Sequence, residues 1–177
     1  EDHGFEQVRT FWKMSWEPTD VPYETIPSGL KIRLFEPERD EMALTKLQNT
    51  CFEGSWGFSP NTVEQIAARV RFEQVESAGI VLATDGAKLV GYNWTSCTSQ
   101  RPSAIGRIEM TGVHPDYRGY GLGRFIVRAG MDLLRRAGVS SVVLDVDSAN
   151  RPAKLIYIFN GFRKVSETIW YQKILEV

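Results

Sequence analysis

The chain has 177 residues, of which 42% are apolar and 24% charged, and this ordinary globular composition excludes an extensively disordered chain. Its net charge of −1 and its short apolar runs argue against a general nucleic-acid binder and against a membrane protein. The two cysteines and two histidines lack the spacing of metal ligands, so we expect reduced thiols, no metal site and a cytoplasmic protein.

The N-terminal segment is similar to a segment near the other end of the chain. Residues 3–8 (His-Gly-Phe-Glu-Gln-Val) match residues 160–165 (Asn-Gly-Phe-Arg-Lys-Val) at three of six positions, and a strand-like aromatic stretch follows each. We therefore predict that residues 1–17 are the last hairpin of a preceding, homologous domain, packed on this domain or on another chain, with a linker over residues 18–29. In that case residues 30–175 should fold without it. The alternative is an N-terminal extension that belongs to this domain.

Residues 30–177 alternate predicted strands and helices, which indicates a layered α/β domain. The first strand is expected at residues 30–34, followed by helices over residues 40–49 and 61–72 that a loop at residues 51–60 connects. The later elements, in chain order, are strands at residues 80–83, 89–94 and 105–113, a helix over residues 122–137 with Gly138 at its end, a strand at residues 139–146, a helix over residues 150–160 and closing strands at residues 162–175.

A glycine-rich segment precedes the helix at residues 122–137. Gly119, Gly121 and Gly123 lack a Cβ, so backbone N–H groups could approach an anion closely, and the helix N-terminus adds a partial positive charge. Arg118 and Arg124 flank these glycines and suit a pyrophosphate. The same glycines could instead serve only a tight turn and close helix packing.

Two known phosphate-binding patterns fit this segment poorly. A Walker A loop requires Gly-Lys-Ser/Thr, whereas this chain has Arg124 and Phe125 after Gly123. A dinucleotide-binding fingerprint that starts at Gly121 would need a third glycine at Ile126. Asp145 lies at a suitable distance along the chain to bind a ribose, so a dinucleotide site is kept as the second hypothesis.

The segment resembles a third pattern, and a second motif agrees with it. Arg118-x-x-Gly121-x-Gly123 resembles the R/Q-x-x-G-x-G/A signature of the GNAT superfamily of N-acetyltransferases. Asn150-x-x-Ala153-x-x-Ile156-Tyr157-x-x-x-Gly161-Phe162 resembles the family's N-x-x-A-x-x-L-Y-x-x-x-G-F, with Ile156 in place of Leu. The resemblance implies the GNAT fold, in which helices flank a central mixed, mostly antiparallel sheet. The predicted two-domain layout is similar to that of tandem, mycothiol-synthase-like GNAT proteins.

The resemblance implies an enzyme that transfers an acetyl group from acetyl-CoA to a primary amine without a metal. Tyr157 matches the family's general acid, which protonates the leaving thiolate, and Glu109 and Asp145 are candidate bases. The strand at residues 111–113 is expected to splay from its neighbour. The residues expected to bind acetyl-CoA are Thr111, Gly112, Val113, Arg118, Gly119, Tyr120, Gly121, Leu122, Gly123, Arg124 and Asn150.

The acceptor and the partners follow less directly from the sequence. We expect a small-molecule or peptide amine, whose pocket is shaped by residues 51–60 and 98–103, with Phe52, Trp56 and Phe58 as wall or lid. A homodimer and a preceding GNAT domain are the partners considered. The alternative function is a catalytically idle, CoA-binding or structural module of a tandem protein.

Overall fold

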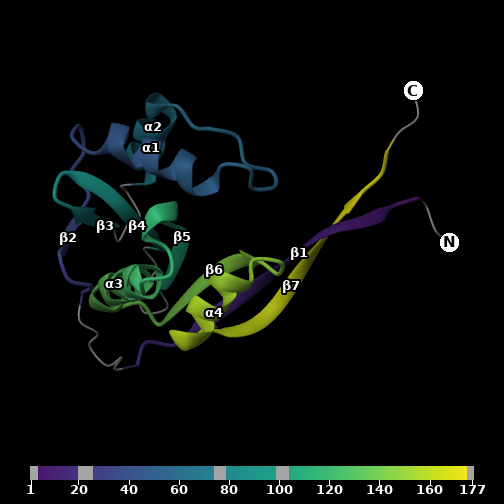
Figure 1. Cartoon of the computed structure of the whole chain (residues 1–177). Helices are drawn as coiled ribbons and strands as arrows, with labels where there is room; N and C mark the ends of the chain where they lie inside the picture. Colours follow the sequence, from purple (N-terminus) through teal and green to yellow (C-terminus); the bar gives the residue numbers. More distant parts are fainter. Residues whose placement is uncertain (1–3, 20–25, 74–78, 99–103, 175–177) are drawn as a thin grey trace.

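The computed structural model describes residues 4–19, 26–73, 79–98 and 104–174. In this part of the chain, seven strands form one sheet in the order β2-β3-β4-β5-β6-β1-β7 (Figure 1). The elements are β1 (Glu6–Trp16), β2 (Leu30–Leu34), α1 (Glu41–Phe52), α2 (Val63–Glu73), β3 (Gly79–Asp85), β4 (Lys88–Cys97), β5 (Ile105–Val113), a 3-10 turn (Pro115–Tyr117), α3 (Leu122–Arg136), β6 (Ser141–Asp147), α4 (Arg151–Phe159) and β7 (Arg163–Gln172). The α/β class predicted from the sequence is confirmed.

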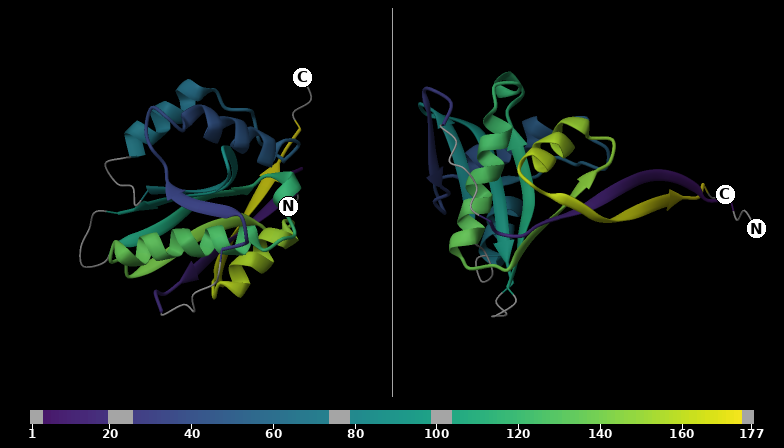
Figure 2. Two further views of the ribbon diagram at one scale, coloured as in Figure 1. Left: turned by 60° about the vertical axis from the view of Figure 1, so that its left-hand side comes forward. Right: turned by 90° about the horizontal axis from the view of Figure 1, so that it is seen from below.

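The helices lie on opposite faces of the sheet (Figure 2), and buried apolar clusters hold them there. On one face, Leu44 of α1 and Ile66 of α2 are buried against Tyr92 and Trp94 of β4. On the other face, the amphipathic helix α3 buries one stripe of residues, Leu122, Ile126, Val127, Met131 and Leu134. None of the helices in the described residues is both long and apolar enough to cross a membrane.

The sheet is mixed and mostly antiparallel, as expected, because among its described strands β5 and β6 alone pair in parallel. Their pairing is short and ends where Arg107 lies opposite Val143. Beyond that point residues 111–113 of β5 keep β4 as a neighbour but have no pairing with β6. The expected splay of this strand is confirmed, and it opens the sheet at its centre.

The N-terminal residues form one strand inside the sheet rather than a hairpin beside it. β1 pairs antiparallel with β6 on one side and with β7 on the other. Met14 and Trp16 are only 1% and 6% exposed, so this strand contributes to the core. The closing segment likewise forms a single strand, β7. β1 fills the gap between β6 and β7, so residues 30–175 alone would leave this sheet interrupted.

The ladder between β1 and β7 has an internal two-fold symmetry. Gly4 and Gly161, which the sequence comparison aligns, both have a positive φ, 71° and 90°. Each strand bulges at the equivalent valine, Val8 in β1 and Val165 in β7, which the pairing skips. If each residue is replaced by its aligned counterpart in the other strand, the pair Glu6–Gln172 becomes Arg163–Ser15 and the pair Gln7–Tyr171 becomes Lys164–Met14. Phe11 pairs with its own counterpart, Thr168.

Candidate active site

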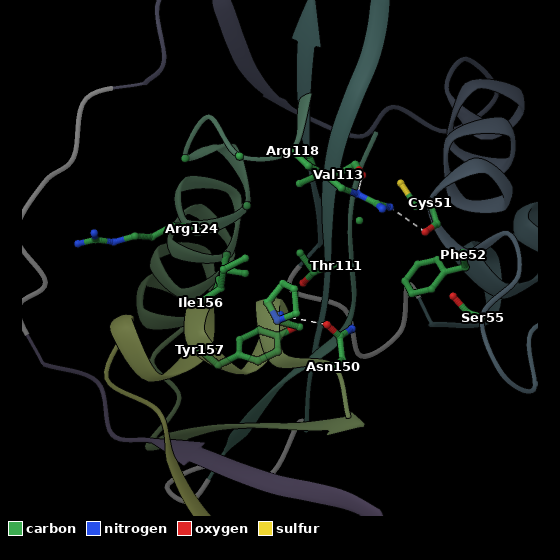
Figure 3. Close-up of a pocket in the computed structure, with 17 residues that line it drawn as sticks. Cys51, Phe52, Ser55, Thr111, Val113, Arg118, Arg124, Asn150, Ile156 and Tyr157 are labelled. Atoms are coloured by element: carbon green, nitrogen blue, oxygen red, sulfur yellow. Dashed lines mark hydrogen bonds between the residues drawn. The ribbon is translucent and has the colours of Figure 1, made fainter. Parts of the chain in front are cut away.

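A cavity of about 530 Å³ lies beside the splayed part of β5 (Figure 3). It is lined by β5, by the loop and first turn that begin α3, by α4, and by the C-terminal end of α1 with the residues after it. Of the residues predicted to bind acetyl-CoA, it brings together Thr111, Gly112, Val113, Arg118, Gly119, Gly121, Gly123, Arg124 and Asn150, and it adds the predicted acid Tyr157. The predicted residues outside the lining are Tyr120, Leu122, Glu109 and Asp145.

The glycines before α3 have two different roles. Gly119 and Gly121 have φ angles of +84° and +82°, and no atom lies within 4 Å of the position that a Cβ would take. Their backbone therefore borders open space, and no side chain caps the first N–H groups of α3. Gly123 serves packing instead, because a Cβ there would lie 2.8 Å from Ile156 Cδ1 of α4.

The two arginines beside these glycines make different contacts. Arg118 donates through Nε to the carbonyl of Val113 at 3.0 Å and through Nη2 to the carbonyl of Cys51 at 2.9 Å. It thereby joins the end of β5 to the end of α1. The guanidinium of Arg124 lies 5.9 Å from the ring centre of Phe159 and points away from the cavity (Figure 3). Tyr120 is 77% exposed, and the side chain of Leu122 is buried in the core.

The strand wall of the cavity fits closely against its neighbours. A Cβ at Gly112 would lie 2.4 Å from the ring of Tyr92 and 3.1 Å from Cys51 Sγ, so only glycine fits there. Burial raises the pKa of Cys51 to about 11, which keeps this lining thiol neutral near pH 7.

Tyr157 is placed by the start of its own helix. The Asn150 side chain accepts a hydrogen bond from the backbone N–H of Ala153 at 3.1 Å, so it caps α4. Tyr157 lies two turns further along and packs edge-on against Phe162. Burial raises the pKa of Tyr157, and a side-chain hydrogen bond with Thr111 opposes that rise. The phenol is therefore protonated near neutral pH and can donate.

The two candidate bases lie just past the point where β5 and β6 separate. Glu109 is skipped in the pairing of β5 with β4, and this bulge directs its side chain to Ser96, whose Oγ donates to Oε1 at 2.6 Å. Arg107 bridges the carboxylates of Glu109, at 3.4 Å, and Asp145. The structure thus brings both carboxylates together around one arginine, although neither lines the cavity.

The segments expected to shape an acceptor pocket are partly described. Phe52 lines the cavity, and Phe58 packs on it with a centroid distance of 5.7 Å. Trp56 packs instead on Trp170 of β7, at 6.0 Å. Residues 99–103, for which we predicted the same role, lie outside the described residues.

The cavity has further lining residues that the sequence did not single out. Cys51 and Ser55 belong to the predicted acceptor segment, but nothing in the local pattern separates them from their neighbours. Ala153 and Ile156 belong to the motif that identified Tyr157, and their helical spacing relative to Tyr157 was the available signal. Within the described ranges, no group of three or more His, Cys, Asp or Glu residues is arranged to hold a metal ion.

Comparison with known sequences gives one family. The model of the acetyltransferase (GNAT) family matches residues 42–162. A mycothiol acetyltransferase of Thermomonospora curvata is 34% identical over an alignment of 176 residues that covers 96% of this chain and 57% of that protein. The chain thus spans a little over half the length of such curated relatives.

Comparison with solved structures shows the same fold. A GCN5-related N-acetyltransferase from Sphaerobacter thermophilus has a TM-score of 0.82 at 24% identity, over 96% of this chain and 53% of that one. A tandem GNAT protein from the clavulanic acid biosynthesis pathway has a TM-score of 0.70 at 19% identity, over 93% and 53%. The yncA protein of Salmonella typhimurium, determined with its cofactor acetyl-CoA, has a TM-score of 0.62 at 18% identity, over 85% and 96%.

Proposed function

Because the chain belongs to the GNAT family of acetyltransferases, we propose that it transfers the acetyl group of acetyl-CoA to the primary amine of a small molecule. The observation that carries this proposal is the cavity, which combines a glycine-lined helix start with a buried, protonated phenol. The naming of the sequence relatives as mycothiol acetyltransferases supports a small-molecule acceptor.

The residues around the cavity fit acetyl-CoA. The uncapped N–H groups at the start of α3, together with Gly119 and Gly121, would hold the pyrophosphate, since a helix N-terminus attracts anions. Residues 111–113 have no pairing with β6, and their backbone groups on that side, apart from the Val113 carbonyl that Arg118 bonds, would bond the pantetheine arm. Bound acetyl-CoA would supply an acetyl group already activated as a thioester, so the protein mainly orients the amine and moves protons.

We assign the proton that the departing sulfur needs to Tyr157. Its hydroxyl belongs to a residue that lines the cavity, and burial keeps it protonated. We assign the proton that the amine loses to Glu109 or Asp145, because both carboxylates lie at the opening between β5 and β6. Since neither lines the cavity, a water molecule would carry the proton to them. Arg107 holds both carboxylates beside this opening through its ion pairs.

Replacing Gly121 with valine tests the proposed pyrophosphate site. A side chain there would project into the open space beside the loop and would also oppose the positive φ. We expect the affinity for acetyl-CoA, measured by calorimetry, to fall roughly tenfold to a thousandfold, as charge-assisted hydrogen bonds are lost.

Gly138→Val is the matched control for backbone strain. Gly138 follows the other end of α3, has a φ of +79° and likewise has no atom within 4 Å of its Cβ position. Both variants should lose stability, but Gly138→Val should bind acetyl-CoA as the unmodified protein does. Equal affinity in the two variants would contradict the assignment of this loop.

We further propose that β1 is the closing strand of a preceding GNAT domain that is related to this one by the two-fold symmetry of the β1·β7 ladder. The equivalent bulges at Val8 and Val165 and the positive φ of Gly4 and Gly161 support this origin. By the same symmetry, β7 would lie between β1 and the other domain's counterpart of β6. Every residue of β7 is exposed, and in the described part of the chain its outer edge has no strand partner.

Hydrogen exchange of the natural full-length protein tests this arrangement. Alternate amides of an antiparallel strand point to opposite sides, so half of the β7 amides face away from β1. We expect these outer amides to exchange fast in the 177-residue chain and slowly in the full-length protein. Fast exchange in both, or a natural protein without a second GNAT domain, would contradict the proposal.

A further inference from the structure

The loop over residues 53–60, which follows α1, is closed at its base by two asparagines. Asn49 of α1 donates through Nδ2 to the backbone carbonyl of Asn61 at 2.9 Å, and its Oδ1 accepts from the backbone N–H of Asn61 at 2.9 Å. Phe52, at the end of α1, packs on Phe58 inside the loop. The base of the 53–60 loop is therefore fixed to α1.

The tip of the loop rests on β1 and β7. The Trp56 ring packs edge-on against Trp170 at a centroid distance of 6.0 Å, and the guanidinium carbon of Arg9 lies 5.3 Å from its centre. Arg9 and Trp170 are directly opposite each other in the β1·β7 ladder, so they share one face of the sheet. Phe11 packs on Trp170 at 6.2 Å, and Asp147 of β6 forms an ion pair with Arg9 at 3.4 Å. We call Arg9, Phe11 and Trp170 the anchor patch.

The contact between the loop and the anchor patch crosses the opening of the sheet. The loop begins at α1, which packs on β4 and β5, whereas β1 and β7 lie beyond β6 in the strand order. Figure 1 shows the loop extending from α1 toward the side of the sheet where β1 and β7 lie. Phe52 and Ser55 line the cavity on the side across from Ile156 (Figure 3). The anchor patch therefore holds the segment that forms this wall of the cavity.

The backbone of the loop does not fix its tip. Gly54 and Gly57, on either side of Trp56, both have a φ of +71°, and no atom lies within 4 Å of the Cβ position of either. Glycine has the widest choice of backbone conformations, so the tip depends on contacts with other elements. Trp56 is 48% exposed, and its contacts with Trp170 and Arg9 tie the tip to the sheet.

We propose that Trp170 and Arg9 are positioning residues for the amine, because they hold Trp56 so that Phe52 and Ser55 form one wall of its pocket. The inference rests on the proposed function, in which the start of α3 and residues 111–113 hold acetyl-CoA. The wall made by the 53–60 loop is then left to the amine. Since the anchor patch belongs to β1 and β7, binding of the amine depends on a strand pair outside the cavity lining.

Hydrogen exchange in the unliganded chain is the first test. The backbone N–H of Ser55 donates to the carbonyl of Phe52 at 2.9 Å and that of Phe58 to the carbonyl of Ser55 at 3.2 Å, so both amides report the order of the loop. Trp170→Thr should speed their exchange roughly two- to tenfold, which corresponds to the loss of one aromatic pair. Trp170→Phe, which keeps an aromatic ring, should restore the slower exchange.

Tyr171→Thr is the matched control for the loss of an exposed aromatic residue from β7. Tyr171 is 57% exposed against 53% for Trp170, and as the next residue of the strand it points to the opposite face. This variant should leave the exchange of the two loop amides unchanged. Unchanged exchange in Trp170→Thr, or an equal increase in both variants, would overturn the proposal.

The second test is kinetic and uses a primary amine that the unmodified protein acetylates. Trp170→Thr should raise the KM for this amine roughly two- to tenfold and leave the KM for acetyl-CoA unchanged. Arg9→Gln should act in the same direction, and neither variant should cause a further rise once Trp56 is replaced by alanine. An unchanged KM for the amine, or an equal rise in the KM for acetyl-CoA, would overturn the positioning role.

The two tests separate this inference from the proposed function. If the unmodified protein transfers no acetyl group, the proposed function fails, and the exchange of the loop amides still decides whether Trp170 holds the loop. If acetyl transfer occurs but the loop amides do not respond to Trp170→Thr, the proposed function stands and the positioning role fails.

Discussion

Tyr157→Phe should lower kcat for acetyl transfer roughly tenfold to a thousandfold, the range expected when a general acid is removed. The substitution keeps the ring and its edge-on packing against Phe162, so the cavity wall should be preserved. It removes the hydroxyl whose proton burial retains near neutral pH. The affinity for acetyl-CoA should change little, because the residues proposed to hold the pyrophosphate lie at the start of α3.

Tyr171→Phe is the matched control, since Tyr171 is an exposed residue of β7 outside the cavity. Its kcat should equal that of the unmodified protein. The measurement is release of the CoA thiol under saturating amine, at a pH where the chemical step limits the rate. Full activity of Tyr157→Phe under these conditions would mean that water or another group protonates the sulfur.

Removal of residues 1–17 should abolish cooperative folding. The deletion takes away β1, which pairs with β6 and with β7, and so separates β7 from the sheet. It also removes Met14 and Trp16 from the core, and burial of a large apolar side chain contributes about 1.5–3 kcal/mol. The free energy lost from the core, together with that lost from the two strand ladders, is comparable with the whole free energy of unfolding of a domain, about 5–15 kcal/mol.

A shorter deletion, of residues 1–5, is the control because it leaves β1 intact from its first residue. Thermal unfolding followed by circular dichroism should show a cooperative transition for this control and none for the longer deletion. A cooperative transition at an unchanged Tm after removal of residues 1–17 would show that β1 is dispensable for the fold.

Much of the fold follows from local sequence patterns. The stripe of apolar residues and the glycine at each end define α3, which runs from Leu122 to Arg136 against a prediction of residues 122–137. The strands β3, β4 and β5 alternate or are continuously apolar, and a short turn joins β3 to β4. These elements are determined by residues close together in the chain, so their order was enough to predict the class.

The place of β1 could not be read from the sequence. Strand pairing over more than a hundred residues leaves no local signal, and β1 and β7 each have the aromatic composition of a strand that could pair with many partners. The similarity of residues 3–8 to residues 160–165 was visible. Only the pairing register shows that this similarity corresponds to a symmetric ladder with bulges at Val8 and Val165.

In the candidate site, too, local motifs could be predicted from the sequence, whereas contacts between distant segments could not. The glycine segment and Tyr157 lie in short motifs, and the structure brings both to one cavity. The guanidinium of Arg118 was expected beside a phosphate, but it bonds the carbonyls of Val113 and Cys51, because the end of α1 lies next to it in space. The close approach of Gly130 of α3 to Asn93 of β4 is likewise a contact that no spacing in the sequence indicates.

Amine-dependent release of the CoA thiol tests most directly the claim that this chain transfers an acetyl group from acetyl-CoA to an amine. The purified chain is incubated with acetyl-CoA and a panel of small-molecule primary amines, with amine-free and protein-free samples as controls. We expect thiol release with at least one amine and a mass increase of that amine by one acetyl group. Binding of acetyl-CoA without release for any amine would contradict the claim and indicate an idle CoA-binding module.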